Sequence, residues 1–253
     1  MITMNQTRPD PEQSPVAIGA IGGSGSRVLA RIIQAAGISI GANLNSAFDN
    51  LEFTARFKTT QIVNLPDPDF FARLPEFEAL SLEQMGSSGE KRWGWKEPNT
   101  HVVIDRILSA YPKMRYVHLL PNGFDMALSG NQNQPRLWGQ IYLGRSVSEP
   151  ITPDEALAYF CEVHRRIDAL AQHPHNQSRI LIVEFEALCG DPKAENARLL
   201  DFLQISPRVP LEALINIVQS PATIGRGRAV DLACFGALDI SYMKTKLPHM
   251  MQS

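Results

Sequence analysis

The sequence predicts an α/β protein with a central parallel β-sheet flanked by helices. Short apolar segments, typical of buried strands, alternate along the chain with amphipathic segments of helical period. The first apolar segment runs through a glycine-rich turn directly into a helix. Strands that alternate with helices form parallel sheets covered on both faces. The chain has 253 residues, of which 44% are hydrophobic, so it can bury such a sheet.

The expected elements follow from apolar periodicity and from turn residues. Residues 16–22 are predicted as the first strand and 25–36 as the first helix, closed by Gly37. Residues 38–90 are expected to hold short helices and loops. The later strands are predicted at 93–95, 114–120 and 179–185. The later helices are predicted at 99–111, with Asn99 as its cap, and at 124–129, 153–172, 194–203 and 211–218.

Composition sets limits on the class of protein. Residues 1–15 contain three prolines and no signal-peptide pattern, so we expect a mobile tail before a single domain at 16–253. The formal net charge of -2 gives no electrostatic case for a nucleic-acid or membrane partner. The three cysteines are widely spaced, which fits a reducing compartment better than a disulfide framework. The expected location is cytoplasmic, and monomer and homodimer both stay open.

The turn after the first strand predicts an anion site. Its sequence is Gly22-Gly23-Ser24-Gly25-Ser26-Arg27. Glycine lets the backbone wrap closely, backbone N–H groups point inward, and the following helix contributes partial positive charge. Ser24, Ser26 and Arg27 add side-chain donors. A side chain at Gly25 is expected to occupy the volume of the anion, which we expect to be a phosphate or sulfate group.

Two familiar nucleotide loops fit this turn poorly. The loop of ATP- and GTP-binding proteins needs Gly-Lys followed by Ser or Thr, whereas Gly25 is followed by Ser26 and Arg27. The glycine spacing also departs from the dinucleotide fingerprint, and no acidic residue clearly ends a second strand. A tight strand-to-helix connection that binds no ligand is the simplest alternative.

Five segments together resemble the sulfotransferases that use 3'-phosphoadenosine 5'-phosphosulfate. They occur in the family order between residue 16 and about residue 232, and each is weak alone. The segments are the glycine turn, Trp93-Gly94-Trp95-Lys96-Glu97-Pro98, residues 114–129, residues 180–203, and Ile224-Gly225-Arg226-Gly227-Arg228. The resemblance implies a P-loop NTPase-like fold, 3'-phosphoadenosine 5'-phosphosulfate as co-substrate, no metal, and a hydroxyl or amine of a small molecule as acceptor.

The resemblance also implies roles for particular residues. Sulfuryl transfer needs a cation near the bridging oxygen and a base near the acceptor, and the family position of the catalytic lysine falls on Lys96. Asp49 and Glu52 are the family-type candidates for the base, with Glu97 and His101 as rivals. The implied co-substrate contacts are Gly22, Gly23, Ser24, Gly25, Ser26, Arg27, Ser129, Arg226, Gly227 and Arg228.

Two positions depart from the family pattern. Pro121 holds the place of an arginine that in the family grips the 3'-phosphate as a bidentate fork, which proline cannot do. Gly23 holds the place of a basic residue in the first loop, and Arg27 lies four residues later. Either affinity for the co-substrate is reduced, or Arg27, Arg226 and Arg228 compensate, or the co-substrate is altered.

The departures keep two other functions open. One is a P-loop-like phosphotransferase, disfavoured by the missing Gly-Lys-Ser/Thr pattern. The other is a nucleotide-binding protein without catalysis. The sequence does not identify the acceptor; Phe70, Phe71 and Phe77 would suit an apolar one, although core packing is the more economical interpretation. The run Asn131-Gln132-Asn133-Gln134 is read as a polar loop or as pocket lining.

Overall fold

The computed structural model describes residues 14–247, and its centre is a five-stranded sheet with the order β2-β3-β1-β4-β5. Every neighbouring pair of strands is parallel. The strands are β1 (Val16–Ala20), β2 (Ile38–Ser39), β3 (Arg92–Lys96), β4 (Arg115–Leu120) and β5 (Ile180–Glu184). The carboxyl ends of β3, β1 and β4 therefore meet at one edge, where ligands of open α/β sheets bind. The predicted fold class is confirmed.

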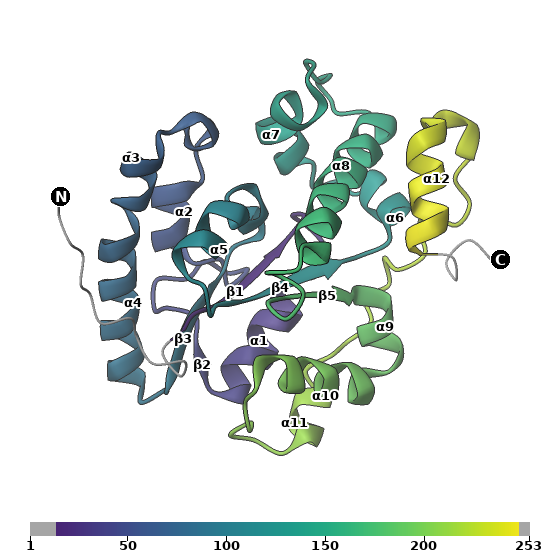
Figure 1. Ribbon diagram of the computed structural model, residues 1–253. Coiled ribbons are helices and arrows are strands. Elements are labelled where there is room, and N and C mark those ends of the chain that lie inside the picture. The colour runs from purple at the N-terminus through teal and green to yellow at the C-terminus, as the bar shows by residue number, and fades with distance from the viewer. Residues whose placement is uncertain (1–13, 248–253) are drawn as a thin grey trace.

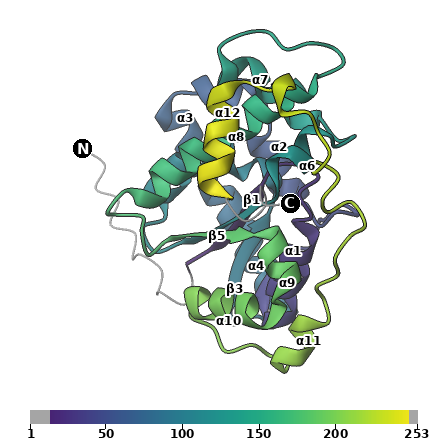
Figure 2. The ribbon, with the colours of Figure 1, turned by 90° about the vertical axis from the view of Figure 1, so that its right-hand side faces the viewer.

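Helices cover both faces of this sheet (Figures 1 and 2). The first half of the chain contributes α1 (Arg27–Ala36), α2 (Leu51–Phe57), α3 (Asp67–Phe71), α4 (Leu74–Ser88), α5 (Ile104–Ala110) and α6 (Gly123–Ala127). The second half contributes α7 (Asn133–Leu143), α8 (Pro153–Gln172), α9 (Phe185–Gly190), α10 (Pro192–Leu203), α11 (Leu211–Ile215) and α12 (Ala237–Lys246). Short 3-10 segments are η2 (Thr60–Asn64), η3 (Pro98–Val102) and η4 (Leu232–Cys234).

The sheet separates two hydrophobic cores. Val16, Ile18 and Ala20 of β1 point to the face covered by α1, α9, α10 and α11. Ala17 and its neighbour Trp95 on β3 point to the opposite face, covered by α2 to α8 and by α12. Successive side chains of a strand alternate between faces, and a strand covered on both sides is apolar at every position. This explains why β1 is buried along its whole length.

Strand β1 ends at Ala20, and the glycine turn begins at Gly22. Gly23 and Gly25 have φ values of 87° and 84°, a left-handed conformation that suits glycine. Helix α1 therefore starts at Arg27, two residues later than predicted, because Gly25 still belongs to the turn. The helix ends at Ala36 with Gly37 as its left-handed cap, φ 104°, as predicted.

Two expectations for the middle of the chain were wrong. Residues 38–90 contain an edge strand, β2, and the 15-residue helix α4, in addition to the short helices expected there. The cap of the segment after β3 is Glu97, whose side chain accepts a hydrogen bond from the backbone N–H of Asn99 at 2.5 Å. Because Pro98 takes the first position of η3, the chain turns earlier than predicted, and α5 follows only at Ile104.

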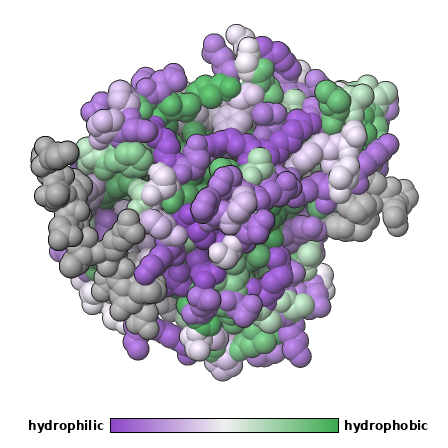
Figure 3. Space-filling model, viewed as in Figure 1, coloured by the Kyte–Doolittle hydropathy of each residue, from purple (hydrophilic) through white to green (hydrophobic). Residues whose placement is uncertain are grey.

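The face of the molecule seen in Figure 3 is mainly polar. Figure 3 shows hydrophilic residues over most of one face, with hydrophobic residues in small separate groups. Within residues 14–247, no helix combines the length and the apolar character needed to cross a membrane. The tail predicted at residues 1–15 falls almost wholly outside the described part of the chain.

Candidate functional site

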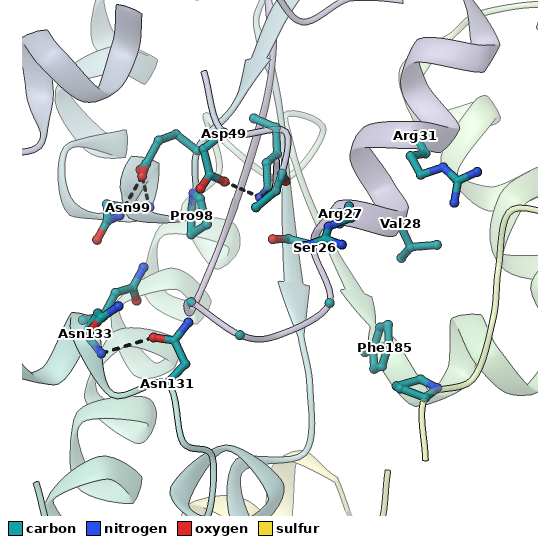
Figure 4. A pocket seen from close by; sticks show the side chains of 18 of the residues that line it. Ser26, Arg27, Val28, Arg31, Asp49, Pro98, Asn99, Asn131, Asn133 and Phe185 are labelled. Carbon is teal, nitrogen blue, oxygen red and sulfur yellow. Dashed lines mark hydrogen bonds and ion pairs between the residues drawn. The ribbon is translucent and has the colours of Figure 1, made fainter. Parts of the chain in front are cut away.

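A cavity of about 610 Å³ opens at the carboxyl ends of β1 and β3 (Figure 4). The glycine turn forms its floor, and Ser26 and Arg27 lie at the middle of the view. Its walls come from the segment before α2, the end of β3, the start of α7, and residues 217–221. Segments far apart in the sequence therefore surround the predicted anion loop.

The loop holds several backbone N–H groups without an internal acceptor. The N–H of Ser24 donates to Ile21 O at 3.2 Å and that of Val28 to Gly25 O at 3.0 Å. For the N–H groups of Gly25, Ser26 and Arg27, no acceptor is present among the described residues. Unpaired N–H groups at a helix start suit an anion, and this arrangement fits a phosphosulfate group.

Gly25 lines this cavity as well as a smaller one, and it packs against an aromatic ring. A Cβ atom at this position would lie 2.7 Å from the ring of Phe185. Phe185 itself lines the cavity. A side chain at Gly25 would therefore meet Phe185 as well, and its effect on the volume of the anion stays a prediction.

Lys96 ends β3 inside the cavity, and its side chain is 2% exposed. Its ammonium group donates to Ala47 O at 3.0 Å and forms an ion pair with the Asp49 carboxylate. Burial lowers the pKa of Lys96, against the effect of the adjacent Asp49. The lysine is thus a desolvated cation held beside the glycine loop by an acid 47 positions away in the sequence.

A tight turn places Asp49. Asn45 accepts hydrogen bonds from the backbone N–H groups of Ala47 and Asp49 at 2.8 and 2.9 Å, and its amide donates to Asp49 Oδ2 at 2.9 Å. Phe48 has a φ of 64°, rare for a residue with a side chain. Backbone strain of this kind persists only where the surroundings enforce it. Here it turns the Asp49 carboxylate toward Lys96.

The other candidate bases occupy different places. Glu52 lies outside the cavity lining and pairs with Arg56 at 2.7 Å on the same helix. Glu97 does line the cavity, is fully buried, and has a pKa raised by burial, with Lys58 3.5 Å away. His101 is buried against Tyr142 and Gln134, and burial lowers its pKa to about 3. Of the four, Asp49 and Glu97 face the cavity.

A smaller cavity of about 180 Å³ adjoins the other side of the glycine turn. Pro121, the position of the family arginine, lies in its wall together with Ser24 and Arg226. Ser24 Oγ and Arg226 Nε are buried and have no hydrogen-bond partner in the described structure. Two unpaired donors therefore lie beside the position of the family arginine, in a cavity that the carboxylates of Asp125 and Glu186 also line.

The basic glycine loop is anchored by an acid. Asp125 accepts hydrogen bonds from the backbone N–H groups of Gly225 and Gly227, both at 2.6 Å. Gly227 packs so closely that a Cβ atom would lie 2.6 Å from Phe124. The backbone of this loop therefore binds α6. Of its two arginines, Arg226 lines the smaller cavity, together with Ile224, and Arg228 does not.

Three predicted contact residues, Gly227, Arg228 and Ser129, lie outside both cavities. Arg228 folds back over Gly225, so that a Cβ atom at that glycine would lie 3.0 Å from Arg228 Nε. Ser129 lies beside the glycine turn, with its Oγ 3.5 Å from the Cβ position of Gly23, and accepts from the backbone N–H of Asn131. Ser129 is therefore close to the loop without lining the space beside it.

Several lining residues were not predicted. Lys58, Asn99 and Phe185 all border the larger cavity. Asn131, Asn133 and Gln134, which the sequence assigned either to a polar loop or to the pocket lining, border it too. A run of side-chain amides after the third family segment was the one signal in the sequence that could have identified this wall.

Comparison with known proteins decides the family. The sequence profile of the sulfotransferase family matches residues 15–208, which is more than half of the chain. This chain belongs to the sulfotransferase family. The resemblance carried by the five segments is confirmed at that level. No curated protein matches the chain.

Solved structures with the same fold are distant in sequence from this family member. The sulfotransferase domain of the Synechococcus olefin synthase is 16% identical over 94% of this chain and 96% of its own, with a TM-score of 0.55. A sulfotransferase from Mycobacterium avium is 11% identical over 95% and 77%, with a TM-score of 0.53. One from Alicyclobacillus acidocaldarius is 16% identical over 95% and 99%, with a TM-score of 0.50. Identities this low establish the fold alone.

Proposed function

We propose that this protein transfers a sulfuryl group from 3'-phosphoadenosine 5'-phosphosulfate to a hydroxyl or amine of a small-molecule acceptor. The observation that carries the proposal is the Lys96–Asp49 pair beside the glycine turn in one cavity. A cation and a carboxylate next to an anion-binding loop supply what in-line transfer of a charged group needs. Membership of the sulfotransferase family supports the reaction class.

The chain's own residues would divide the work. The free N–H groups of the glycine turn would bind the phosphosulfate, and Lys96 would stabilise negative charge on the leaving oxygen. Asp49 would accept the proton of the acceptor, because a carboxylate keeps free lone pairs after two hydrogen bonds. Glu97 is the second candidate for this step, since it also faces the cavity.

Separate variants distinguish the two acids. Asp49→Asn keeps the hydrogen bond to Lys96 but removes the base, whereas Glu97→Gln leaves Asp49 in place. We expect turnover to fall on the order of a hundredfold in Asp49→Asn, which is the scale of one general base. In Glu97→Gln we expect turnover to fall far less. The reverse order would assign the base to Glu97. Equal turnover in both variants and the wild type would remove both acids from the reaction.

Ligand binding tests the donor. Calorimetric titration with 3'-phosphoadenosine 5'-phosphate, adenosine 5'-phosphosulfate and ATP, each with and without magnesium, compares the competing functions. Tight binding of the first nucleotide without magnesium, together with sulfated product from an acceptor panel, supports the proposal. Magnesium-dependent ATP binding would instead indicate a phosphotransferase. Nucleotide binding without turnover across the panel would indicate a non-catalytic relative. The cytoplasmic location stays a prediction.

A further inference from the structure

The larger cavity has two chemically different ends on either side of the glycine turn (Figure 4). Val28, Arg31 and Phe185 lie on one side of Ser26, and Asn99, Asn131 and Asn133 lie on the other. Val28, Phe185 and Ile217 are the large apolar residues of the described lining, and all three pack in one core cluster. A flat nucleotide base suits that end. The opposite end, beyond Lys96, is left for the acceptor.

The acceptor end is lined by polar side chains, most of which are amides. Its residues are Lys58, Glu97, Asn99, Asn131, Asn133 and Gln134. Within residues 14–247, the side chain of Asn133 and the Nδ2 group of Asn131 make no hydrogen bond, and both residues are exposed. Each amide can donate and accept, as a hydroxyl group does.

Charge at this end is balanced. Lys58 faces Glu97 at 3.5 Å, and Lys96 pairs with Asp49. Each of these two lysines therefore has a carboxylate beside it, which reduces the electrostatic attraction of the acceptor end for a charged acceptor. The neutral amides are the groups left to recognise the acceptor.

The aromatic residues that could have formed an apolar acceptor pocket face away from the cavity. Phe53 stacks on Trp95 with ring centroids 5.2 Å apart, and Phe77 meets the same ring edge-on at 5.3 Å. Phe70 is fully buried against Phe57. None of these rings lines the cavity. A large apolar acceptor would thus have amides for neighbours and would leave their polar atoms unpaired, which costs free energy.

We infer that the acceptor of the proposed sulfuryl transfer is a neutral, hydroxyl-rich small molecule of the sugar or polyol class. Asn131, just before α7, and Asn133, its first residue, are the residues that would select it, because the buried amide of Gln134 already contacts Ala20 O and His101. This inference rests on the proposed function, because it places the acceptor beyond Lys96 in the same cavity.

An acceptor panel tests the inference. The panel contains methyl glucoside and myo-inositol as polyols, 4-nitrophenol and 1-octanol as apolar alcohols, and tyramine as a cation, each with 3'-phosphoadenosine 5'-phosphosulfate. We expect kcat/KM for a polyol to exceed that for the other acceptors by about tenfold or more, as in sites built to hydrogen-bond a substrate. Titration of the same polyols into protein saturated with 3'-phosphoadenosine 5'-phosphate provides a readout that does not depend on turnover.

A matched pair of variants on one helix locates the selectivity. Asn133→Leu puts an apolar side chain at the acceptor end, and Gln140→Leu puts one at an exposed position of α7 outside the cavity. We expect Asn133→Leu to lower kcat/KM for polyols about tenfold, which is the scale of one lost hydrogen bond. The same variant should raise kcat/KM for 1-octanol. Affinity for 3'-phosphoadenosine 5'-phosphate should stay within about twofold in both variants, and Gln140→Leu should match the wild type.

The outcomes separate this inference from the proposed function. A wild-type protein that does not bind 3'-phosphoadenosine 5'-phosphate overturns the proposed function and, with it, the inference. A protein that binds this nucleotide but prefers 1-octanol, 4-nitrophenol or tyramine overturns the inference alone. Absence of polyol binding and turnover in a nucleotide-binding protein does the same, as does an Asn133→Leu variant with unchanged polyol kinetics.

Discussion

Replacing Lys96 by methionine tests the chemistry of the site most directly. Methionine keeps the length of the side chain but removes its charge, at a position 2% exposed where a smaller residue would leave a cavity. The ammonium group now donates to Ala47 O and to the Asp49 carboxylate. The substitution therefore removes the proposed leaving-group cation and leaves Asp49 with the Asn45 amide as its remaining side-chain partner.

The structure sets the expected size of both effects. The Asp49 side chain is 17% exposed, so water can take over part of the lost interaction. The free energy of unfolding should then fall by about 1–3 kcal/mol, less than for a fully buried pair. Turnover should fall on the order of a hundredfold, the usual cost of one preorganised donor, because the charge matters most when the leaving oxygen becomes negative.

The assay separates chemistry from binding. Single-turnover rates with 3'-phosphoadenosine 5'-phosphosulfate report the chemical step, and calorimetry with 3'-phosphoadenosine 5'-phosphate reports affinity, which should change by less than about threefold. Lys113→Met at an exposed position provides the matched control. If a folded Lys96→Met variant loses less than about threefold in rate, well below the scale of one donor, the lysine is not the catalytic cation.

Three further perturbations address the loop, the missing arginine and the buried histidines. Gly25→Val should abolish nucleotide binding measured by calorimetry, because the valine side chain displaces Phe185 and the residue must adopt a φ of 84°. Circular dichroism should show that the variant stays folded. Unchanged affinity would show that the loop does not form the site. Pro121→Arg should tighten binding of 3'-phosphoadenosine 5'-phosphate by about ten- to a hundredfold, since a charge-assisted hydrogen bond contributes about 1.5–3 kcal/mol. The affinity for adenosine 5'-phosphosulfate should stay unchanged. An equal gain in affinity for both nucleotides would contradict a specific contact between the arginine and the 3'-phosphate. Burial lowers the pKa of His164 to about 4, so the unfolded chain binds a proton there that the folded protein does not. This histidine alone should lower the free energy of unfolding by about 1.4 kcal/mol per pH unit as pH drops from about 6.5 toward 4, in addition to the effects of the buried His101 and His118. Urea unfolding at several pH values should show a shallower slope in His164→Phe, and an unchanged slope would remove His164 as a cause.

Local sequence determined the framework of the fold. The first strand, the turn with Gly23 and Gly25, and the cap at Gly37 follow from rules that act over a few residues. The predicted helix 153–172 matches α8, because Thr152 and Glu155 form a capping box that defines its start. The parallel direction of the strands also followed from the alternation of strands and helices.

Tertiary structure decided the contents of the site. Lys96 and Asp49 meet only because the turn at Asn45 is held against the end of β3, where the N–H of Asn50 donates to Lys96 O at 2.7 Å. Sequence alone could not rank Asp49 above Glu52, because the two acids are only three positions apart. In the structure, Asp49 lines the cavity, whereas Glu52 lies on the surface of a helix beside Arg56.

The same limit applies to the acceptor end and to the aromatic residues. Phe70 and Phe77 belong to a ring cluster around Trp95, and the amides at the start of α7 line the cavity instead. Periodicity states which side of a helix is apolar, but it does not state which element that side packs against. Local rules therefore determined β1, β3, β4 and β5, the glycine turn and the position of Lys96, whereas long-range packing determined β2, the partners of that lysine and the polar wall of the cavity.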